Sequence, residues 1–279
     1  MLCHIYVNTF LLGFLMVNDY IYKSVILLTA TIVPNGTSNT ALQNSEIRKD
    51  QYLQVIEYYL KNTCCKIVVC ENTNTNIYDD IKHEQKSCRL EYITFPGNDY
   101  DKNRGKGYGE AAIIKYALEN SEFLKSSDYL FKITGRVKIK NIKKLIKKKI
   151  YRYQNVIGIE CWGYNWMHSV CFFCCKDWLY ATVSNYRPRL DDDTFCFQTM
   201  LYNAVLRTKG INIVSIHPYI DGISGKTGKP YVNNHIFQRK FDNYTGLKSI
   251  YYVRNEKLKF TYSYISWLFY RLLVKMFLM

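Results

Sequence analysis

A glycine-rich, basic segment at residues 104–110 is the first candidate for chemistry. Its sequence, RGKGYGE, follows an apolar run and precedes a stretch of helical periodicity. Glycines let backbone amides approach phosphate oxygens, and the positive end of a helix adds to that attraction. Arg104 and Lys106 supply further charge. The spacing is neither a dinucleotide fingerprint nor a P-loop, so it predicts phosphate binding of another kind, with a tight turn as the alternative.

A second basic residue, Arg136, stands where another apolar run ends, in the segment KITGR at residues 132–136. A guanidinium at that position can hold a diphosphate through its fixed fork of donors and neutralise the charge that develops on it. The alternative is a surface arginine in a salt bridge.

Acidic residues recur at Asp-x-Asp spacing in two places. Asp99 and Asp101 lie in a polar turn, and Asp191, Asp192 and Asp193 precede a stretch of helical periodicity. Either run offers the hard oxygen ligands that Mg²⁺ or Mn²⁺ takes, and the alternatives are a turn and a helix N-cap. For the second run we favour a general base that acts on an acceptor hydroxyl, and the sequence does not choose among its three members.

His217 ends the last predicted strand and precedes a glycine-rich loop at residues 220–231. The imidazole is a candidate for contact with a diphosphate or a metal, and a packed histidine at a strand end is the alternative. Asp221, Ser224 and Lys226 lie in a loop whose composition suits closure over a ligand.

Ten cysteines occur, and three of them form a CxxCC pattern at Cys171, Cys174 and Cys175. This spacing is compatible with a metal or redox site. However, the pattern lies within the apolar run VCFFCC, which predicts a buried strand whose thiols pack as small hydrophobic groups. Reduced thiols of this kind indicate a cytosolic compartment.

Composition limits the class of protein. The chain has 279 residues, 48% hydrophobic and 22% charged, which argues against a disordered chain or a coiled coil. The 38 Lys and Arg residues exceed the 23 acids and give a net charge of +15. An excess of this size indicates a phosphate-bearing partner, such as a nucleic acid, an anionic lipid or a phosphorylated small molecule.

Apolar runs and helical periods alternate along the first half. Strands are predicted from residue 23 and at 66–71, 90–95 and 128–133, and helices at 48–62 and 110–120. This alternation predicts an α/β fold with a parallel sheet. Ligands bind at the carboxyl ends of such strands. Those ends are residues 29–35, 71–76, 96–109 and 134–136.

The second half is less regular. Strands are predicted at 156–160, 169–175 and 211–217, and a helix at 192–206, where the opening acids suit the positive end of the helix.

The basic residues form two surfaces. Residues 132–152 contain ten Lys or Arg, and an amphipathic helix is predicted at 141–151. Residues 257–279 combine Lys and Arg with Trp and Phe at helical spacing, which suits the headgroup boundary of an anionic membrane. The lysine face at 132–152 also suits an anionic membrane, with nucleic acid as the alternative partner. For residues 257–279 the alternative is a C-terminal helix docked on the core.

Several segments together carry a resemblance to a known family. ILLTATIVPN, IRKDQYLQVIEYYL, KIVVCENTN, RGKGYGE and YLFKITGRVKIKNI resemble bacterial surface-polysaccharide glycosyltransferases of GT-A-like type, from capsule and O-antigen clusters. The resemblance covers residues 23–140 well. It implies a single nucleotide-diphospho-sugar transferase domain with a central, mostly parallel sheet. It also implies sugar transfer from a nucleotide donor to a polyprenyl-diphosphate-linked glycan at the cytoplasmic face of the inner membrane.

We expect residues 23–246 to form the transferase domain, after an N-terminal extension at 1–22. The basic, aromatic pattern near the C-terminus predicts a peripheral membrane-associating tail at 247–279. The family usually has Asp-x-Asp where this chain has Thr134–Arg136, so Arg136 is expected to replace Mg²⁺ or Mn²⁺. Glu71 is the candidate for base or ribose recognition. The remaining donor-binding candidates are Thr29, Thr31, Arg104, Lys106, Gly107, Gly109, Glu110, Thr134 and Gly135.

Two other functions remain open. A phosphotransferase or nucleotidyltransferase acting on a lipid-linked sugar would require a metal and paired carboxylates in its pocket. A module that binds membranes or nucleic acid would present a continuous basic face without a deep pocket. We favour the glycosyltransferase, with no nucleic-acid partner.

Overall fold

The computed structural model describes residues 24–37, 40–81, 88–147, 156–160 and 166–231. The predicted N-terminal extension (1–22), the predicted membrane-associating tail (247–279) and part of the predicted amphipathic helix (148–151) lie outside the described residues. The domain limits at 23 and 246 lie outside them too and stay a prediction. None of the described helices combines the length and the apolar character needed to cross a membrane.

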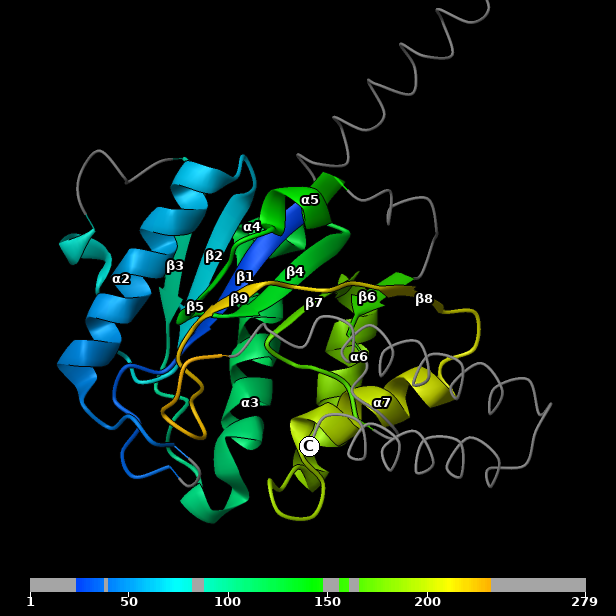
Figure 1. The fold of residues 1–279 in the computed structure, drawn as a ribbon. Coiled ribbons are helices and arrows are strands. Elements are labelled where there is room, and N and C mark those ends of the chain that lie inside the picture. Colours follow the sequence, from blue (N-terminus) through cyan, green and yellow to red (C-terminus); the bar gives the residue numbers. More distant parts are fainter. Residues whose placement is uncertain (1–23, 38–39, 82–87, 148–155, 161–165, 232–279) are drawn as a thin grey trace, which may run out of the picture.

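A seven-stranded sheet forms the centre of the protein, in the order β3-β2-β1-β4-β7-β6-β8 (Figure 1). Strand β7 runs antiparallel to its neighbours β4 and β6, and the other pairings are parallel. This mixed α/β architecture confirms the predicted fold class. The strands are β1 (Ser24–Ala30), β2 (Lys66–Glu71), β3 (Leu90–Thr94), β4 (Tyr129–Thr134), β6 (Val156–Ile159), β7 (Cys171–Cys175) and β8 (Asn212–Ser215).

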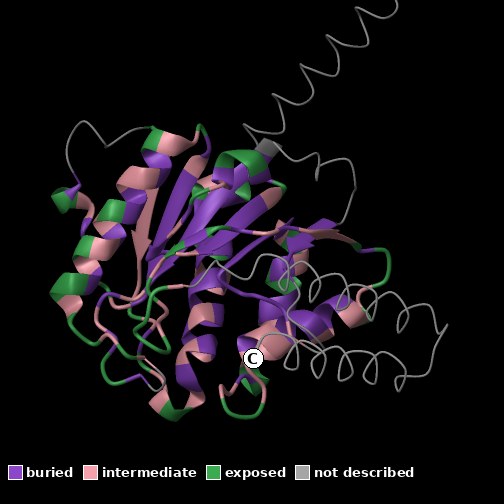
Figure 2. Cartoon of the chain, viewed as in Figure 1, coloured by how far each residue is buried: buried purple, intermediate pink, exposed green. Residues whose placement is uncertain are grey.

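Helices cover both faces of the sheet, which is why β1 is buried along its whole length. Ile26 and Leu28 of β1 pack with α2 (Ser45–Asn62) and α5 (Ile142–Lys147) on one face. The alternate residues of β1 face the other side, where the helices are α3 (Gly105–Asn120), α4 (Glu122–Lys125), α6 (Lys176–Tyr186) and α7 (Phe197–Arg207). The inner strands β1, β4, β6 and β7 and the neighbouring β2 are accordingly almost entirely buried, whereas the edge strands β3 and β8 are mostly half-buried (Figure 2).

A small two-stranded sheet connects distant parts of the chain. Strand β5 (Val137–Ile139) follows β4 after a two-residue turn and pairs antiparallel with β9 (Ile220–Gly222). The loop after β9 lies beside the loop after β1 (Figure 1), and the Ala41 amide donates to the Gly225 carbonyl (2.9 Å). This pairing brings Arg136 and the glycine-rich loop to the same edge of the main sheet.

Helix α2 begins at Ser45, slightly before the predicted start at residue 48, and two other predicted helix starts are wrong by more. Helix α3 begins at Gly105 rather than at residue 110, so the glycine-rich segment is its first turn and not a loop before it. Helix α7 begins at Phe197 rather than at residue 192, because Asp191 and Phe195 form a β-bridge that keeps the acids out of the helix. Three 3₁₀ turns complete the described structure: η1 (Tyr78–Asp80), η3 (Lys102–Arg104) and η5 (Arg187–Arg189).

The cysteine pattern lies in β7, and its thiols are free. Cys171 and Cys174 are buried, and burial raises the pKa of the Cys171 thiol to about 12. A thiol with such a pKa stays protonated at neutral pH and is a poor metal ligand and nucleophile. The prediction of a buried strand with packed thiols is confirmed for Cys171 and Cys174.

Candidate active site

A cavity of about 160 Å³ opens at the carboxyl ends of β1 and β4. This is the edge of the sheet where the sequence places ligand binding. Residues from several elements line it: the β1 end, the first turns of α3, the β4 end, the start of α7 and the loop after β9. Ten residues singled out from the sequence are among them: Thr29, Thr31, Lys106, Gly107, Gly109, Glu110, Thr134, Arg136, Asp192 and Ser224.

Asp192 occupies the N-terminus of helix α3. Its carboxylate accepts hydrogen bonds from the backbone amides of Lys106 and Gly107, both at 3.1 Å. The glycine-rich, basic sequence predicts a phosphate at these amides. In the structure the anion at this positive helix end is a carboxylate of the chain itself, which corrects that expectation. Of the three consecutive acids, Asp192 is the one that lines the cavity.

The glycines of the first turn are explained by this contact. A Cβ atom on Gly107 would lie 2.7 Å from Asp192 Oδ1, and one on Gly105 would lie 2.4 Å from the Asp192 carboxyl carbon. Gly105 also has a φ of +78°, which side chains rarely adopt. A Cβ atom on Gly109 would meet the hydroxyl of Tyr100 at 2.4 Å. Small residues are therefore required so that Asp192 and Tyr100 can approach the helix.

Arg104 supports this arrangement from outside the cavity. Its Nε donates to the carbonyl of Leu190 (3.0 Å), and its guanidinium stacks on the ring of Tyr108 at 4.3 Å. In return, the Asp192 amide donates to the Arg104 carbonyl (3.2 Å). Arg104 thus anchors the segment that carries Asp192. Its predicted direct contact with a diphosphate is not supported, because it does not line the cavity.

Arg136 lines the cavity and is 8% exposed. Its Nη1 donates to the neutral side chain of Gln51 (3.0 Å), and no carboxylate among the described residues pairs with it. A Cβ atom on Gly225 would lie 3.1 Å from Arg136 Nη2, so the loop after β9 packs directly against the guanidinium. The alternative of an exposed, salt-bridged arginine is therefore wrong for the described part of the chain.

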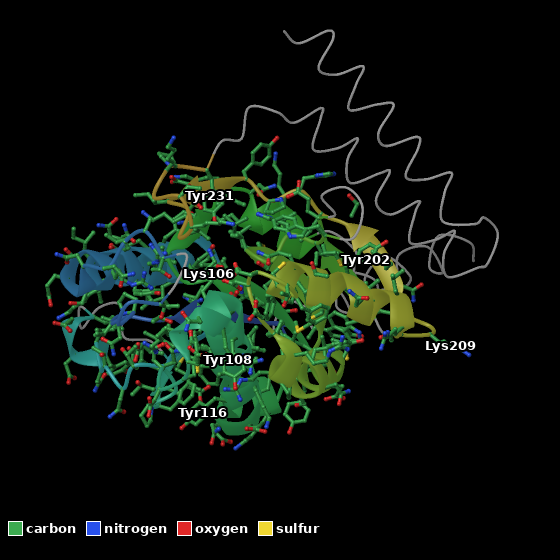
Figure 3. The ribbon with its side chains drawn as sticks, turned by 90° about the horizontal axis from the view of Figure 1, so that it is seen from below. Lys106, Tyr108, Tyr116, Tyr202, Lys209 and Tyr231 are labelled. Atoms are coloured by element: carbon green, nitrogen blue, oxygen red, sulfur yellow. The ribbon has the colours of Figure 1, made fainter. Side chains whose placement is uncertain are left out.

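Other cations share this region with Arg136. Burial is the main cause that lowers the pKa of Lys106; the charges of Asp192 and Glu110 act against this shift, and those of Lys226 and Arg136 add to it. Arg48 also has a lowered pKa, through burial first and through the Arg136 charge as well. Figure 3 shows Lys106 on the same side of the molecule as Tyr231, which also lines the cavity. Partly buried, mutually repelling cations favour an anionic ligand.

Glu110, which lines the cavity, forms an ion pair with Lys132. Lys132 is fully buried, and its ammonium also donates to Ser169 O (2.8 Å) and Thr134 Oγ1 (3.3 Å). These three acceptors match the three N–H groups of an ammonium. Thr29 Oγ1 donates to the same Glu110 oxygen as Lys132 (3.4 Å). The pair locks the ends of β1 and β4 to helix α3.

Glu71 connects three loops and strands through its carboxylate. Its buried carboxylate accepts hydrogen bonds from the amides of Ile32 (3.0 Å), Thr73 (2.8 Å) and Thr75 (2.9 Å). Thr94 Oγ1 donates to it as well (3.0 Å). The carboxylate organises the loops after β1 and β2 and does not line the cavity, so recognition of a base or ribose by Glu71 is not supported.

Three further candidates for the acceptor side lie away from the cavity lining. His217 has Nδ1 at 3.5 Å from Glu160 and Nε2 at 3.2 Å from Ser215 Oγ. Asp221 pairs with Lys140 (2.9 Å). Lys226 is exposed on the loop, within electrostatic reach of Lys106.

Two other members of the acidic runs, Asp191 and Asp101, serve as local caps. Asp191 Oδ1 accepts from the amides of Asp193 (2.9 Å) and Thr194 (3.2 Å), which lowers the pKa of Asp191. Asp101 caps η3 through the Asn103 amide. Asp99 and Asp193 are exposed.

Gly135 has a packing role at the end of β4. Its amide donates to the Thr29 carbonyl (3.0 Å), and a Cβ atom there would lie 2.7 Å from the Thr29 oxygen.

The sequence leaves open whether the protein holds Mg²⁺ or Mn²⁺, and the side chains that could coordinate such an ion decide how well it would fit. No group of three or more His, Cys, Asp or Glu within the described ranges is arranged to hold a metal ion. Of the two carboxylates that line the cavity, Asp192 is engaged through both oxygens by backbone amides, and Glu110 is paired with the Lys132 ammonium through Oε1. The donor set therefore does not fit a metal held by protein ligands alone.

Sequence reasoning missed several cavity residues: Arg48, Tyr52, Tyr100, Ser169, Phe197, Gln198 and Tyr231. Most of them reach the cavity from elements whose position depends on tertiary packing. One signal was readable, since Lys132 is a charged residue inside the apolar run of β4 and charged residues are almost never fully buried without a partner. That pattern predicts an acidic neighbour, which is Glu110.

The sequence matches no protein-family model and no curated protein. Solved structures do show similarity. A protein described as a nucleotide-diphospho-sugar transferase from Desulfovibrio desulfuricans G20 has 12% identity and a TM-score of 0.43, over 70% of this chain and 80% of that one. A 4-diphosphocytidyl-2C-methyl-D-erythritol synthase from Anaerococcus prevotii has 11% identity and a TM-score of 0.42, over 81% and 98%.

Proposed function

We propose that this protein is a transferase that binds a nucleotide-diphospho-sugar in the cavity at the ends of β1 and β4. The observation that carries the proposal is Arg136, a buried cation with no carboxylate partner among the described residues, which repels its neighbours Lys106 and Arg48. A diphosphate carries the charge that relieves this repulsion. Its two phosphates can engage the guanidinium fork and the lysine together.

The chemistry follows from where these charges lie. When the bond between the sugar and the diphosphate breaks, negative charge accumulates on the leaving diphosphate. Arg136 and Lys106 are already in place at the cavity, so this charge develops beside fixed cations and no reorganisation is needed. In this proposal Arg136 takes the part that a divalent metal has in many transferases.

Asp192 is the residue of the acidic run that we assign to the acceptor side. Burial is the main cause that raises its pKa, while the hydrogen bond from the Gly107 amide and the charge of Lys106 act against that rise. A carboxylate with a raised pKa is a stronger base. Its two bonds to backbone amides hold it in a fixed orientation toward the cavity, as a general base requires.

The proposal extends to the acceptor and to the place of the reaction. We propose a polyprenyl-diphosphate-linked glycan as the acceptor, in surface-polysaccharide synthesis at the cytoplasmic face of the inner membrane. The support is the resemblance and the basic, aromatic pattern at residues 257–279. An amphipathic helix contributes as well, since Ile142, Leu145 and Ile146 of α5 are buried beneath its lysines.

A nucleotidyltransferase is the second candidate. It is favoured by two carboxylates, Glu110 and Asp192, that line one cavity. Such an enzyme would bind a nucleoside triphosphate, and a divalent cation would strengthen that binding. The glycosyltransferase would instead bind a diphospho-sugar in the absence of a metal.

A thermal-shift panel of UDP-, GDP-, CMP- and dTDP-sugars with EDTA tests the proposal. A ligand at 100 times its Kd stabilises a protein by about 2.7 kcal/mol, which raises the Tm of a chain of this size by about 5–10 °C. We expect one nucleotide class to give such a shift in the wild type and in Lys209→Ala. Lys209 is exposed and lies at the far edge of the molecule from Lys106 (Figure 3). Stabilisation by a triphosphate with Mg²⁺ alone would favour the nucleotidyltransferase.

A further inference from the structure

Glu110 presents two carboxylate oxygens in different environments. Oε1 accepts hydrogen bonds from Lys132 and from Thr29. Oε2 accepts none from any described residue. The side chain is 19% exposed and lines the cavity. One oxygen is therefore held by the protein, and the other is available to a ligand.

The bond to Lys132 fixes where the free oxygen lies. Lys132 is fully buried and is held by Ser169 and Thr134 as well, so its ammonium cannot follow a moving carboxylate. Glu110 itself stands in the second turn of α3, whose first turn is fixed by Asp192. Oε2 is thus a preorganised acceptor, and ordering it on binding costs little.

The chemistry of Oε2 limits what can contact it. An ionised carboxylate accepts hydrogen bonds and donates none. A phosphate oxygen at this position would be repelled, whereas a hydroxyl would donate to it. Yet the charge of Glu110 raises the pKa of Lys106, which shows that the two side chains are near one another. Lys106 and Arg136 are the cations that we propose to hold the diphosphate. The ligand must therefore present a hydroxyl a short distance from its phosphates.

The neighbours of Glu110 indicate which hydroxyl this is. Glu110 also acts on Asp192, which we assign to the acceptor side, and on Tyr231 in the loop after β9. The group that lies between a diphosphate and an acceptor is the sugar to be transferred. We propose that Glu110 selects a sugar-bearing nucleotide over the bare nucleotide, because Oε2 accepts a hydrogen bond from a hydroxyl of the transferred sugar. This inference rests on the proposed function.

Calorimetric titration of two ligands tests it: the nucleotide-sugar that performs best in the panel, and the corresponding nucleoside diphosphate. Glu110→Gln is the variant. Glu119→Gln is the matched control, since Glu119 lies on the same helix, is half-exposed and pairs with Lys115. We expect Glu110→Gln to weaken the nucleotide-sugar by at least about tenfold, the loss of a hydrogen bond to a charged group. The nucleoside diphosphate should change less than about twofold, and Glu119→Gln should change neither.

Several results of these titrations would overturn the inference. An equal loss for both ligands means that Glu110 reads the ribose or supports the fold, and overturns the inference. No loss for either ligand overturns it too. If the wild type binds no nucleotide-sugar, the proposed function fails and the inference fails with it. If Glu110→Gln does not fold, the double variant Glu110→Gln/Lys132→Met removes both charges of the buried pair, and the same selective loss is required of it.

Discussion

Replacing Lys132 by Met tests the buried ion pair most severely. The substitution keeps an unbranched side chain of similar length but removes three hydrogen bonds, to Glu110, Ser169 O and Thr134 Oγ1. Removing one partner of a buried pair typically costs 3–5 kcal/mol, because the other charge is left uncompensated. Glu110 is 19% exposed and can recover some hydration from the cavity. We therefore expect a loss near the lower end, about 3 kcal/mol.

The assay is urea unfolding followed by tryptophan fluorescence, with the free energy of unfolding taken from the midpoint at a constant m-value. The control is Lys115→Met, on helix α3, which pairs with Glu119 at 3.6 Å on the surface and should change stability by less than about 0.5 kcal/mol. The double variant Lys132→Met/Glu110→Gln should recover part of the loss, since it leaves no uncompensated charge. A loss of less than about 1 kcal/mol in Lys132→Met would contradict the burial and pairing described above.

Three further predictions follow from particular groups. The pKa of Lys106 is lowered, mainly by burial, so this lysine loses its charge at a lower pH than an exposed lysine does. The affinity for a diphosphate should therefore fall as the pH rises through that range. In titrations of Lys106→Met this decline should be missing. Gly107→Ala should cost about 1–3 kcal/mol in urea unfolding, since its Cβ would overlap Asp192. A thiol reagent should label the exposed Cys64 rapidly in the native protein and leave the buried Cys171 unlabelled, as peptide mapping would show. Labelling of Cys171 before the protein unfolds would refute the packing of β7.

The central sheet could be predicted because its signal is local. The apolar run that becomes β1 and the helical period that becomes α2 both follow from residue spacing within one segment. Their ends are set by local features too, as at Asn44, whose side chain caps α2 by accepting from the Ile47 amide. The carboxyl ends of the strands then placed the cavity at the correct edge of the sheet.

The details of the site were harder to predict, because they depend on contacts between distant residues. The glycines at 105 and 107 indicated a backbone that something approaches closely, which is correct. The sequence could not show that this group is Asp192, some 85 positions away, rather than a phosphate. The position of Glu71 at a strand end likewise predicts contact with a ligand, but its carboxylate accepts hydrogen bonds from the amides of two folded loops.

The small sheet of β5 and β9 also could not be predicted from residue spacing. Each strand has three residues, too few for a period to be recognised. Their pairing nevertheless brings the glycine-rich loop against Arg136, which explains why Ser224 lines the cavity as predicted. Asp221, three residues earlier, points instead to Lys140.

The central claim is that Arg136 holds a diphosphate without a metal, and one titration tests it directly. The nucleotide-sugar selected by the panel is titrated into wild type, Arg136→Ala, Arg136→Lys and Arg207→Ala, each with EDTA. Arg207 is exposed at the end of α7 and serves as the control. We predict binding to the wild type in EDTA, a loss of at least about tenfold in Arg136→Ala, incomplete recovery in Arg136→Lys, and no change in Arg207→Ala. Binding by Arg136→Ala at wild-type affinity, or binding by the wild type only when Mn²⁺ is restored, would contradict the claim.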